Sequence, residues 1–364
     1  MSYRFLRNVV VKGLLLFFVF NLLWAACNGN RINQLSLYNR LLRGRERFPY
    51  GENPAQSYNL SLSDLDAMFA SHVLAGSPKS SNEFRVIVIG DSSIWGTLLR
   101  PEETLPGILN ARHLTAPDGR SMEFYNLGYP TMSLVKDLMV LDQAMQYAPD
   151  LILWAVTLES FPRENQLISP IVAQNPVRVN ALIDRSDLEL TPLEESAGFW
   201  QRTIVAQRRP LADWLRLQFY GVMWSATGVD QTYPTDYTPA LRDLEPNANY
   251  QDWVPPEIPA GGLAMDVISA GMEIAGEVPI LLVNEPILVS DGENSDIRYN
   301  YYYPRWVYDQ YRQNLEGTCE REGWTCLDLW DAVPQEFFTN SAIHRNPEGE
   351  LRFATSLIES GVLP

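Results

Sequence analysis

Residues 84–93, FRVIVI followed by GDSS, decide the fold of this chain. Phe84 to Ile89 is a short β-branched run, which is typical of a buried strand. Gly90-Asp91-Ser92-Ser93 follows at once, at the position where a strand turns into a helix. Such a turn can expose the hydroxyl of Ser92 while nearby backbone N–H groups point at the same space. The pattern suits a nucleophile that attacks an acyl carbon.

Four further apolar runs repeat the strand pattern along the chain. They cover residues 122–127, 151–156 and 278–283 and, more weakly, 324–329. Helical periodicity over 134–147, 262–275 and 305–315 separates them, and Asn346 and Pro347 begin a last helix. Strand and helix alternate five times, which predicts an α/β fold over 84–364. We expect three layers, α/β/α, with a five-stranded parallel sheet.

The connection between the third and fourth strands is longer than one crossover helix needs. It has roughly 120 residues, so we predict an insertion over about 160–258. Within it, residues 211–224 (LADWLRLQFYGVMW) form an apolar segment. Two interpretations stay open for this segment. It is either a lid or a surface that lies on a membrane or a partner, or it is the insertion's own buried core.

The charge balance argues against a nucleic-acid partner. The chain has 364 residues, with 28 Lys and Arg against 44 Asp and Glu and a net charge of −16. Such a surface repels phosphate backbones, so we expect no nucleic acid to bind. The sequence also has no metal-ligand spacing, phosphate-binding loop or dinucleotide fingerprint, and we therefore expect no metal and no cofactor.

The N-terminal segment is an apolar run from Val9 to Cys27, which follows a short tail of residues 1–8. As a helix this run is about 28 Å long, close to the hydrocarbon thickness of a bilayer. We interpret it as an uncleaved transmembrane anchor. A cleaved signal peptide and a lipoprotein modified at Cys27 are the alternatives. Residues 28–83 then form a juxtamembrane segment that leads into a short helix.

Two of the three cysteines indicate the compartment. Cys319 and Cys326 flank a turn that contains Gly323. A loop-closing disulfide between them needs an oxidising compartment, whereas the alternative is a pair of free thiols. Together with the anchor, the disulfide predicts a single-pass protein of the cell membrane with an extracytoplasmic globular domain.

A serine nucleophile needs a base, and the chain has three histidines. His72 precedes the first strand, and His113 follows the first helix. Only His344 follows the last strand, just before the final helix. Because ligands bind at the carboxyl ends of the strands in such sheets, His344 can meet Ser92 there.

Four motifs in this order resemble the SGNH (GDSL) hydrolase superfamily. They are GDSS at 90–93, NLG at 126–128, PDLILW at 149–154 and HRNPEG at 344–349. The resemblance covers about residues 84–360 and implies a flavodoxin-like sheet, with Ser92 as nucleophile and His344 as base. It also implies that the backbone N–H groups of Ser92 and Gly128 are donors of the oxyanion hole.

One departure from the superfamily affects the oxyanion hole. Where the superfamily usually has Gly-x-Asn-Asp after the third strand, this chain has Thr157-Leu158-Glu159-Ser160. A carboxylate aimed at a developing oxyanion would oppose catalysis. We therefore expect either that Glu159 turns away or that Asn126 or Asn284 serves as the missing donor.

A second departure affects the acid of the triad. The superfamily usually has Asp three residues before the histidine, whereas this chain has Ser341, preceded by Asn340. A neutral side chain can orient the imidazole, or Asp331 or Asp328 can supply the acid from the preceding loop. Glu285, which follows the fourth strand, either binds a substrate hydroxyl or forms a structural ion pair.

These residues predict a membrane-anchored serine esterase or O-acyltransferase that acts on acyl esters outside the cytoplasmic membrane. Its substrate would be an acylated small molecule or a surface glycan. The alternative is a non-catalytic accessory protein on a degenerate SGNH scaffold, with residues 160–258 as the surface for a membrane-protein partner.

Geometry discriminates between the two functions. The enzyme is favoured by contact between Ser92 Oγ and His344, with a carboxylate or carbonyl on the other ring nitrogen. A remote His344 and a Glu159 that points at Ser92 would favour the accessory protein.

Overall fold

The computed structural model describes residues 2–27, 35–37, 41, 47–48, 65–76, 78–195, 198–227 and 237–363. One sheet contains β1 (Glu83–Gly90), β2 (Ser121–Gly128), β3 (Leu151–Val156), β4 (Ile280–Asn284) and β5 (Thr325–Asp328). The strand order is β2-β1-β3-β4-β5, and every neighbouring pair is parallel. The predicted five-stranded parallel sheet is therefore confirmed, with each strand within two residues of its expected bounds.

The order of the strands creates a crevice beside β1. The chain runs from β1 outward to β2 and then returns to β3 on the other side of β1. Loops that leave neighbouring strands in opposite directions open a crevice at the carboxyl edge, where such sheets bind ligands. Ser92 is the first residue of α5 (Ser92–Trp95), directly after β1, so the topology places it in this crevice.

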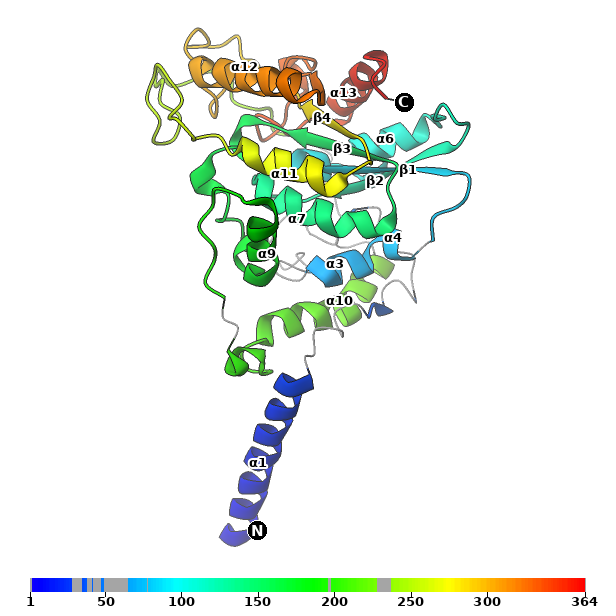
Figure 1. Cartoon of the computed structure of the whole chain (residues 1–364), viewed down its shortest axis with the longest axis vertical. Helices are drawn as coiled ribbons and strands as arrows, with labels where there is room; N and C mark the ends of the chain where they lie inside the picture. Colours follow the sequence, from blue (N-terminus) through cyan, green and yellow to red (C-terminus); the bar gives the residue numbers. More distant parts are fainter. Residues whose placement is uncertain are drawn as a thin grey trace.

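Helices cover both faces of the sheet (Figure 1). Ile87 and Ile89 pack with α7 (Leu134–Ala144), α11 (Met265–Ala275) and α12 (Arg305–Glu322). Val86 and Val88 point to the opposite face and pack with α6 (Leu105–Ala111) and α13 (Pro347–Glu359). This alternation follows from the period of two along a strand. The three predicted layers are confirmed.

The described residues also form other α-helices and several short 3-10 turns. The α-helices among them are α1 (Tyr3–Cys27), α3 (Leu65–Ser71), α4 (Val73–Gly76), α8 (Pro170–Ala173), α9 (Pro176–Ser186) and α10 (Arg208–Thr227). The short 3-10 turns are η3 (Pro101–Glu103), η4 (Met145–Tyr147), η5 (Leu158–Ser160), η6 (Arg163–Asn165), η7 (Phe199–Arg202) and η9 (Gln335–Phe337).

Local signals set the ends of the last two long helices. Asn346 caps α13, because its Oδ1 accepts the N–H of Gly349 at 2.9 Å, and Pro347 occupies the first helical position. The helix expected over 305–315 continues to Glu322. It ends only at Gly323, which has the left-handed φ of +69° that stops a helix. Its last turns are mostly polar, so the apolar periodicity did not reveal them.

Part of the predicted insertion extends the core of the domain. Val179 and Leu182 of α9 belong to the same buried cluster as α7 and α11. The apolar segment 211–224 forms most of α10, which packs on α3 through Leu217 and leaves Phe219 65% exposed. The interpretation of this segment as a buried core of the insertion is therefore wrong.

α1 extends away from the domain and is the lowest element in Figure 1. Within the described residues it is the one helix long and apolar enough to cross a membrane, by length and composition. Near its end, Trp24 Nε1 donates to Gln207 Oε1 at 3.4 Å. Of the juxtamembrane segment expected over 28–83, most residues from 28 to 64 lie outside the described residues, and α3 is the short helix expected near its end.

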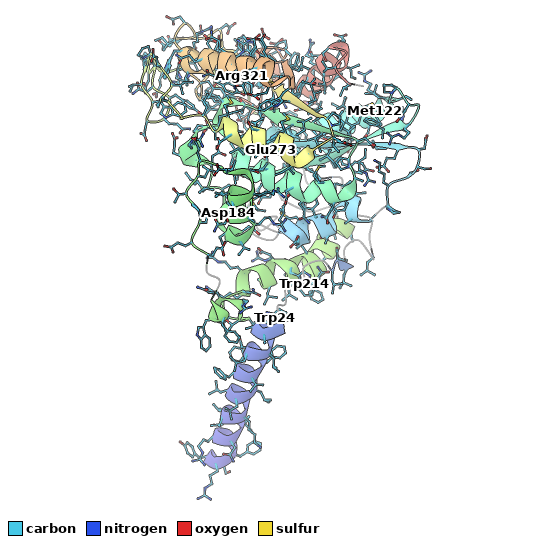
Figure 2. The ribbon with its side chains drawn as sticks, in the orientation of Figure 1. Trp24, Met122, Asp184, Trp214, Glu273 and Arg321 are labelled. Atoms are coloured by element: carbon cyan, nitrogen blue, oxygen red, sulfur yellow. A yellow bond between two sulfur atoms is a disulfide. The ribbon has the colours of Figure 1, made fainter. Side chains whose placement is uncertain are left out.

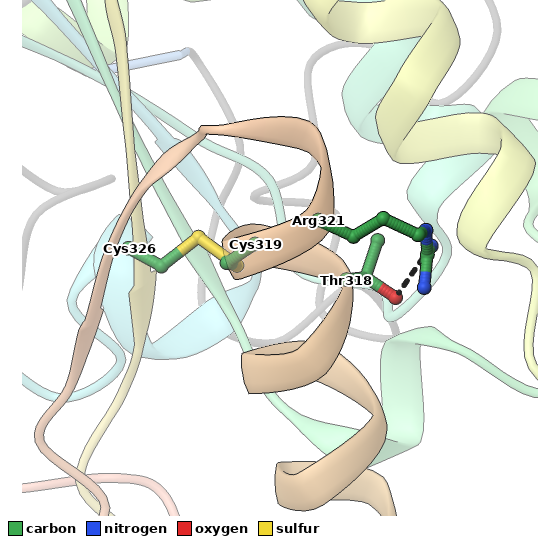
Figure 3. Close-up of a disulfide and its surroundings, with 4 residues drawn as sticks. All are labelled: Thr318, Cys319, Arg321 and Cys326. Atoms are coloured by element: carbon green, nitrogen blue, oxygen red, sulfur yellow. Dashed lines mark hydrogen bonds between the residues drawn. A yellow bond between two sulfur atoms is a disulfide. The ribbon is translucent and has the colours of Figure 1, made fainter.

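Cys319 and Cys326 form a disulfide whose Cα atoms are 6.2 Å apart. Figure 3 shows Cys319 on the last turns of α12 and Cys326 on the strand that follows, with Arg321 donating to the hydroxyl of Thr318 beside them. The bond joins α12 to β5 across the turn at Gly323. It therefore ties down the strand at one edge of the sheet.

Candidate active site

Ser92 and His344 form the centre of the candidate site. Ser92 Oγ lies 2.8 Å from His344 Nε2, although 252 positions separate the two residues in the chain. Ser92 begins α5, and His344 lies in the loop before α13. The other histidines are elsewhere: His72 is buried near the carbonyl of Asn126, and His113 is exposed. The structure thus brings together the serine and the histidine that the sequence singled out.

Asn340 holds the other ring nitrogen of His344. Its Oδ1 lies 3.0 Å from His344 Nδ1, and the Thr339 hydroxyl donates to the same oxygen at 3.3 Å. An amide oxygen only accepts, so Nδ1 carries the proton and Nε2 presents its lone pair to the hydroxyl of Ser92. This is the tautomer that a histidine base requires.

Neither candidate aspartate contacts His344. Asp331 is exposed, and within the described part of the chain no hydrogen bond or ion pair joins it to the imidazole. Asp328 is paired with Arg312, whose Nη2 lies 2.6 Å from Asp328 Oδ2. The assignment of Asp331 as the acid is therefore wrong in this geometry. The reason is a tight turn, closed by the Thr339 N–H donating to the His344 carbonyl at 2.8 Å, which puts Asn340 beside the ring instead.

The protonation state of His344 suits a base. The pKa of His344 is lowered to about 4, mainly by burial. The negative charge of Asp91 opposes this shift, and the positive charge of Arg345 adds to it. The imidazole is therefore neutral at neutral pH and can accept a proton from Ser92.

The backbone N–H of Ser92 is available to an oxyanion. The first N–H groups of a helix have no partner within the helix, and Ser92 is the first residue of α5. The next N–H, that of Ser93, donates to Asp91 Oδ1 at 2.8 Å. Among the described contacts, the N–H of Ser92 donates to no backbone or side-chain oxygen.

The backbone N–H of Gly128 is already engaged. It donates to Asn126 Oδ1 at 3.0 Å, while Asn126 Nδ2 donates to the carbonyl of Ile94 at 2.9 Å. A Cβ on Gly128 would lie 2.2 Å from the backbone nitrogen of Trp95, so only glycine allows this approach. The expectation that Gly128 and Asn126 are oxyanion donors is therefore wrong for this conformation. These residues instead hold β2 against α5, and so position Ser92.

Asn284 is occupied elsewhere. Its Oδ1 accepts the hydroxyl of Tyr311 at 3.1 Å, and its Nδ2 donates to Asp328 Oδ1 at 2.8 Å. The amide of Asn284 thus links β4 to α12 and β5. It is not an oxyanion donor, because both ends of the amide are used in this link.

The insertion holds Glu159. The Tyr250 hydroxyl donates to Glu159 Oε2 at 3.1 Å, and Gln251 Nε2 donates to Oε1 at 3.2 Å. Burial raises the pKa of Glu159 above its ordinary value, and the negative charge of Asp91 raises it further. The hydrogen bond from Tyr250 acts in the opposite direction and lowers the pKa. Both carboxylate oxygens therefore contact the insertion, and no described hydrogen bond joins them to Ser92.

A buried ionic network lies behind the Ser92–His344 pair. Ser93 Oγ donates to Glu285 Oε2, and Arg345 Nη1 lies 3.2 Å from the same oxygen. Arg345 Nε also donates to Glu350 Oε1 at 2.8 Å. Burial raises the pKa of Glu285 well above its ordinary value; the charge of Asp91 adds to this, whereas Arg345 opposes it. Of the two roles predicted for Glu285, binding a substrate hydroxyl or forming a structural ion pair, its contact with Arg345 matches the ion pair.

Sequence reasoning missed the other members of this network and a second buried cation, Lys136. Lys136 Nζ donates to the carbonyl of Gly90 at 2.7 Å and lies 2.5 Å from Asp137 Oδ1. It thereby holds the end of β1 just before Ser92. A signal was present, since Lys136 and Asp137 interrupt an otherwise largely apolar helix, but their spacing does not say what they bind.

A cavity of about 320 Å³ opens beside the pair, lined by Ser92, Trp95, Thr97, Pro130, Thr131, Asn340 and His344. A larger cavity of about 450 Å³ lies between α12 and β5, beside the disulfide, and contains neither Ser92 nor His344. The smaller cavity is the candidate substrate site, because it contains the nucleophile and the base. Within the part of the chain that the structure describes, no group of three His, Cys, Asp or Glu side chains is arranged to hold a metal ion.

No protein-family model matches the chain, and no curated protein does. Solved structures are similar at low identity. A member of the lipolytic protein G-D-S-L family from Veillonella parvula DSM 2008 is 11% identical, with a TM-score of 0.36 over 76% of this chain and 96% of that one. A carbohydrate acetylesterase from Sinorhizobium meliloti is 12% identical, with a TM-score of 0.35 over 76% and 97% of the two chains.

The native aryl esterase of M. smegmatis is similar to the same extent. It is 12% identical, with a TM-score of 0.34 over 76% of this chain and 97% of that one. Activity is therefore inferred from the contacts around Ser92 and His344 and not from similarity at this level.

Proposed function

We propose that this protein is a membrane-anchored serine esterase or O-acyltransferase that acts on acyl esters outside the cytoplasmic membrane. The observation that carries the proposal is the 2.8 Å contact between Ser92 Oγ and His344 Nε2, with Asn340 Oδ1 on the other ring nitrogen. Geometry of this kind distinguishes an activated serine from one in a structural role.

The reaction follows from the positions of these atoms. His344 Nε2 takes the proton of Ser92 Oγ as that oxygen attacks the acyl carbon, and the oxyanion that forms accepts the N–H of Ser92. The intermediate collapses to an acyl-Ser92 ester, and His344 gives its proton to the departing alkoxide. Water or an acceptor hydroxyl, deprotonated by His344, then attacks the acyl group and restores Ser92.

Two further features support the proposed location. α1 has the length and composition of a membrane span. Cys319 and Cys326 form a disulfide, and structural disulfides are typical of proteins in oxidising compartments. An enzyme anchored there would meet acylated small molecules or surface glycans, and access of water to the acyl-enzyme would decide between hydrolysis and transfer.

A second candidate function, a non-catalytic binding protein, is favoured by one observation. The N–H of Gly128 is engaged by Asn126, which leaves the N–H of Ser92 as the donor identified for an oxyanion. Loss of one such donor costs about 3 kcal/mol of transition-state stabilisation. An intact serine–histidine pair weighs more, since a binding protein has no need to keep it.

The test is active-site labelling of the full chain with a fluorophosphonate, with the modified residue mapped by mass spectrometry. We expect an adduct on Ser92 that is lost in Ser92→Ala and His344→Ala and kept in His113→Asn, which changes an exposed histidine. An unlabelled Ser92 in a chain shown to be folded by its cooperative thermal transition would contradict the enzyme and support the binding protein.

A further inference from the structure

α10 has one face packed on the domain and one face exposed. On the packed face, Leu217 is fully buried and contacts Ala67 of α3 and Trp214. On the other face, Leu215, Phe219 and Met223 follow one another at four-residue intervals. They are 46%, 65% and 51% exposed, and Tyr220 beside them is 52% exposed. Because a helix repeats every 3.6 residues, these side chains form one continuous apolar stripe, called here the α10 face.

Exposed arginines flank the α10 face. Arg208, Arg209 and Arg216 are all exposed, and the angular order of the helix places them on the same side as the stripe. Residues 198–227 contain four arginines and one acidic residue, in a chain whose net charge is −16. The segment is therefore basic although the chain as a whole is acidic, and such a segment favours contact with an anionic surface.

The α10 face begins where α1 reaches the domain. Gln207, which immediately precedes α10, is hydrogen-bonded to Trp24 near the end of α1. In Figure 2, Trp24 and Trp214 lie at the base of the domain, with α1 projecting below them. η7 lies there too, and its Trp200 is 65% exposed. A bilayer that α1 spans would therefore end at the level of η7 and α10.

Exposed apolar side chains concentrate at this level. Outside α1, fifteen large apolar side chains are exposed among the described residues, and ten of them belong to residues 35–41 or 199–223. The two segments are in contact, since Trp214 Nε1 donates to the carbonyl of Leu35 at 3.1 Å. Scattered exposed apolar side chains need no explanation, but a concentration of them marks a binding surface.

We propose that η7 and α10 lie in the headgroup region of the membrane, with the α10 face buried at the boundary with the acyl chains. A helix with Leu, Phe and Tyr on one face and flanking arginines has the composition of an interfacial helix. Its arginines extend toward anionic headgroups while their stems cover apolar surface. The inference rests on the membrane anchoring in the proposed function, and it makes α10 a second contact that orients the domain on the bilayer.

Depth-dependent fluorescence quenching in nanodiscs of phosphatidylcholine and phosphatidylglycerol tests the proposal on the full chain. Single cysteines at Phe219 or Met223, in a Cys27→Ser background with the disulfide kept oxidised, are labelled with bimane. Lipids brominated along the acyl chain are the quenchers. Phe18→Cys in α1 is the positive reference, and Leu241→Cys, at a residue 70% exposed on the domain, is the negative one.

We expect quenching at 219 and 223 by bromines near the headgroup, quenching at 18 by deeper bromines, and none at 241. Quenching at 18 with none at 219 and 223 would overturn the proposal while the anchor stands, and would leave the α10 face to a protein partner. No quenching at any position would overturn the anchor as well. Thermal melting of each variant compared with the parent chain separates loss of contact from loss of folding.

Discussion

Ser93 and Arg345 contact the same oxygen of Glu285, although they lie on segments 252 positions apart. Each is the immediate neighbour of a residue of the proposed catalytic pair, since Ser93 follows Ser92 and Arg345 follows His344. The buried carboxylate therefore ties together the two backbone segments that carry the nucleophile and the base. A displacement of either segment would disturb the 2.8 Å contact between Ser92 and His344.

Arg345→Met should destabilise the protein strongly. It leaves the buried carboxylates of Glu285 and Glu350 without their cation, and breaking a buried ion pair costs about 3–5 kcal/mol. Chemical denaturation measures the free energy of unfolding. The matched control is Arg352→Met in α13, the helix that also carries Glu350; its pair with Glu348 is exposed, so the substitution should change that free energy by at most about 1 kcal/mol. Equal effects of the two substitutions would contradict the role of the network.

Asn340→Asp should raise activity. A carboxylate on His344 Nδ1 stabilises the imidazolium that forms in the transition state better than the amide oxygen now there. A hydrogen bond to a charged group is more stabilising than one to a neutral group by about 1.4 kcal/mol. That difference in transition-state free energy corresponds to a gain of about tenfold in kcat/KM. Hydrolysis of an activated aryl ester measures it. Asn340→Ala removes the orienting group and should lower the rate, so a rise in both variants would show that Asn340 does not orient the base.

The activity should persist in mildly acidic solution. Burial lowers the pKa of His344 to about 4, and the base works only when it is unprotonated. The acidic limb of the profile of kcat/KM against pH should therefore fall with a midpoint near 4, below the ordinary histidine pKa of about 6.5. In Asn340→Asp the same midpoint should move upward, because the new negative charge favours the imidazolium. A limb near 6.5 in the parent chain would contradict the burial of His344.

Gly128→Ala should destabilise the protein and disturb the site. The added Cβ would lie 2.2 Å from the backbone nitrogen of Trp95, and backbone atoms cannot give way cheaply. Overpacking of this kind costs about 1–3 kcal/mol and would push α5, with Ser92, away from β2. Gly317→Ala is the contrasting variant. Gly317 lies inside α12 with open space around it. Alanine is the better helix former, so Gly317→Ala should raise the free energy of unfolding by about 0.5–1 kcal/mol. The melting temperatures of the two variants should therefore move in opposite directions.

Reduction of the disulfide should lower stability. Cys319 and Cys326 close a short loop, with a sequence separation of 7, and the chain-entropy account assigns about 2–3 kcal/mol to such a link. The melting temperature should fall when dithiothreitol is added to the parent chain. A Cys319→Ala, Cys326→Ala variant should melt at the lower temperature with or without the reductant. If the parent chain does not respond, the bond does not stabilise the fold.

Much of the fold was visible in the sequence because it rests on local patterns. Runs such as 84–89 and 151–156 have the length and the β-branched content of buried strands, and the structure places strands there. The pairing of Ser92 with His344 was also predictable, since both follow strands whose carboxyl ends share one edge. These inferences needed only periodicity and chain order.

The donors and the buried charges were not predictable in the same way. Whether the N–H of Gly128 faces the cavity or Asn126 depends on the conformation of one turn, which residue types do not determine. The contact of Glu285 with Ser93 joins positions 192 apart, and no local pattern connects them. For α10, most positions from 211 to 224 are apolar, so periodicity alone did not indicate which face is packed and which is exposed.

The span of 252 residues between Ser92 and His344 has a consequence for the life of the protein. Ser92 leaves the ribosome 252 residues before His344 does. A chain still being translated therefore contains the proposed nucleophile before it contains the proposed base. A chain cut anywhere between the two residues would keep the nucleophile and lack its proposed base, so the proposed chemistry begins only after the segment that carries His344 has been made and has docked beside Ser92.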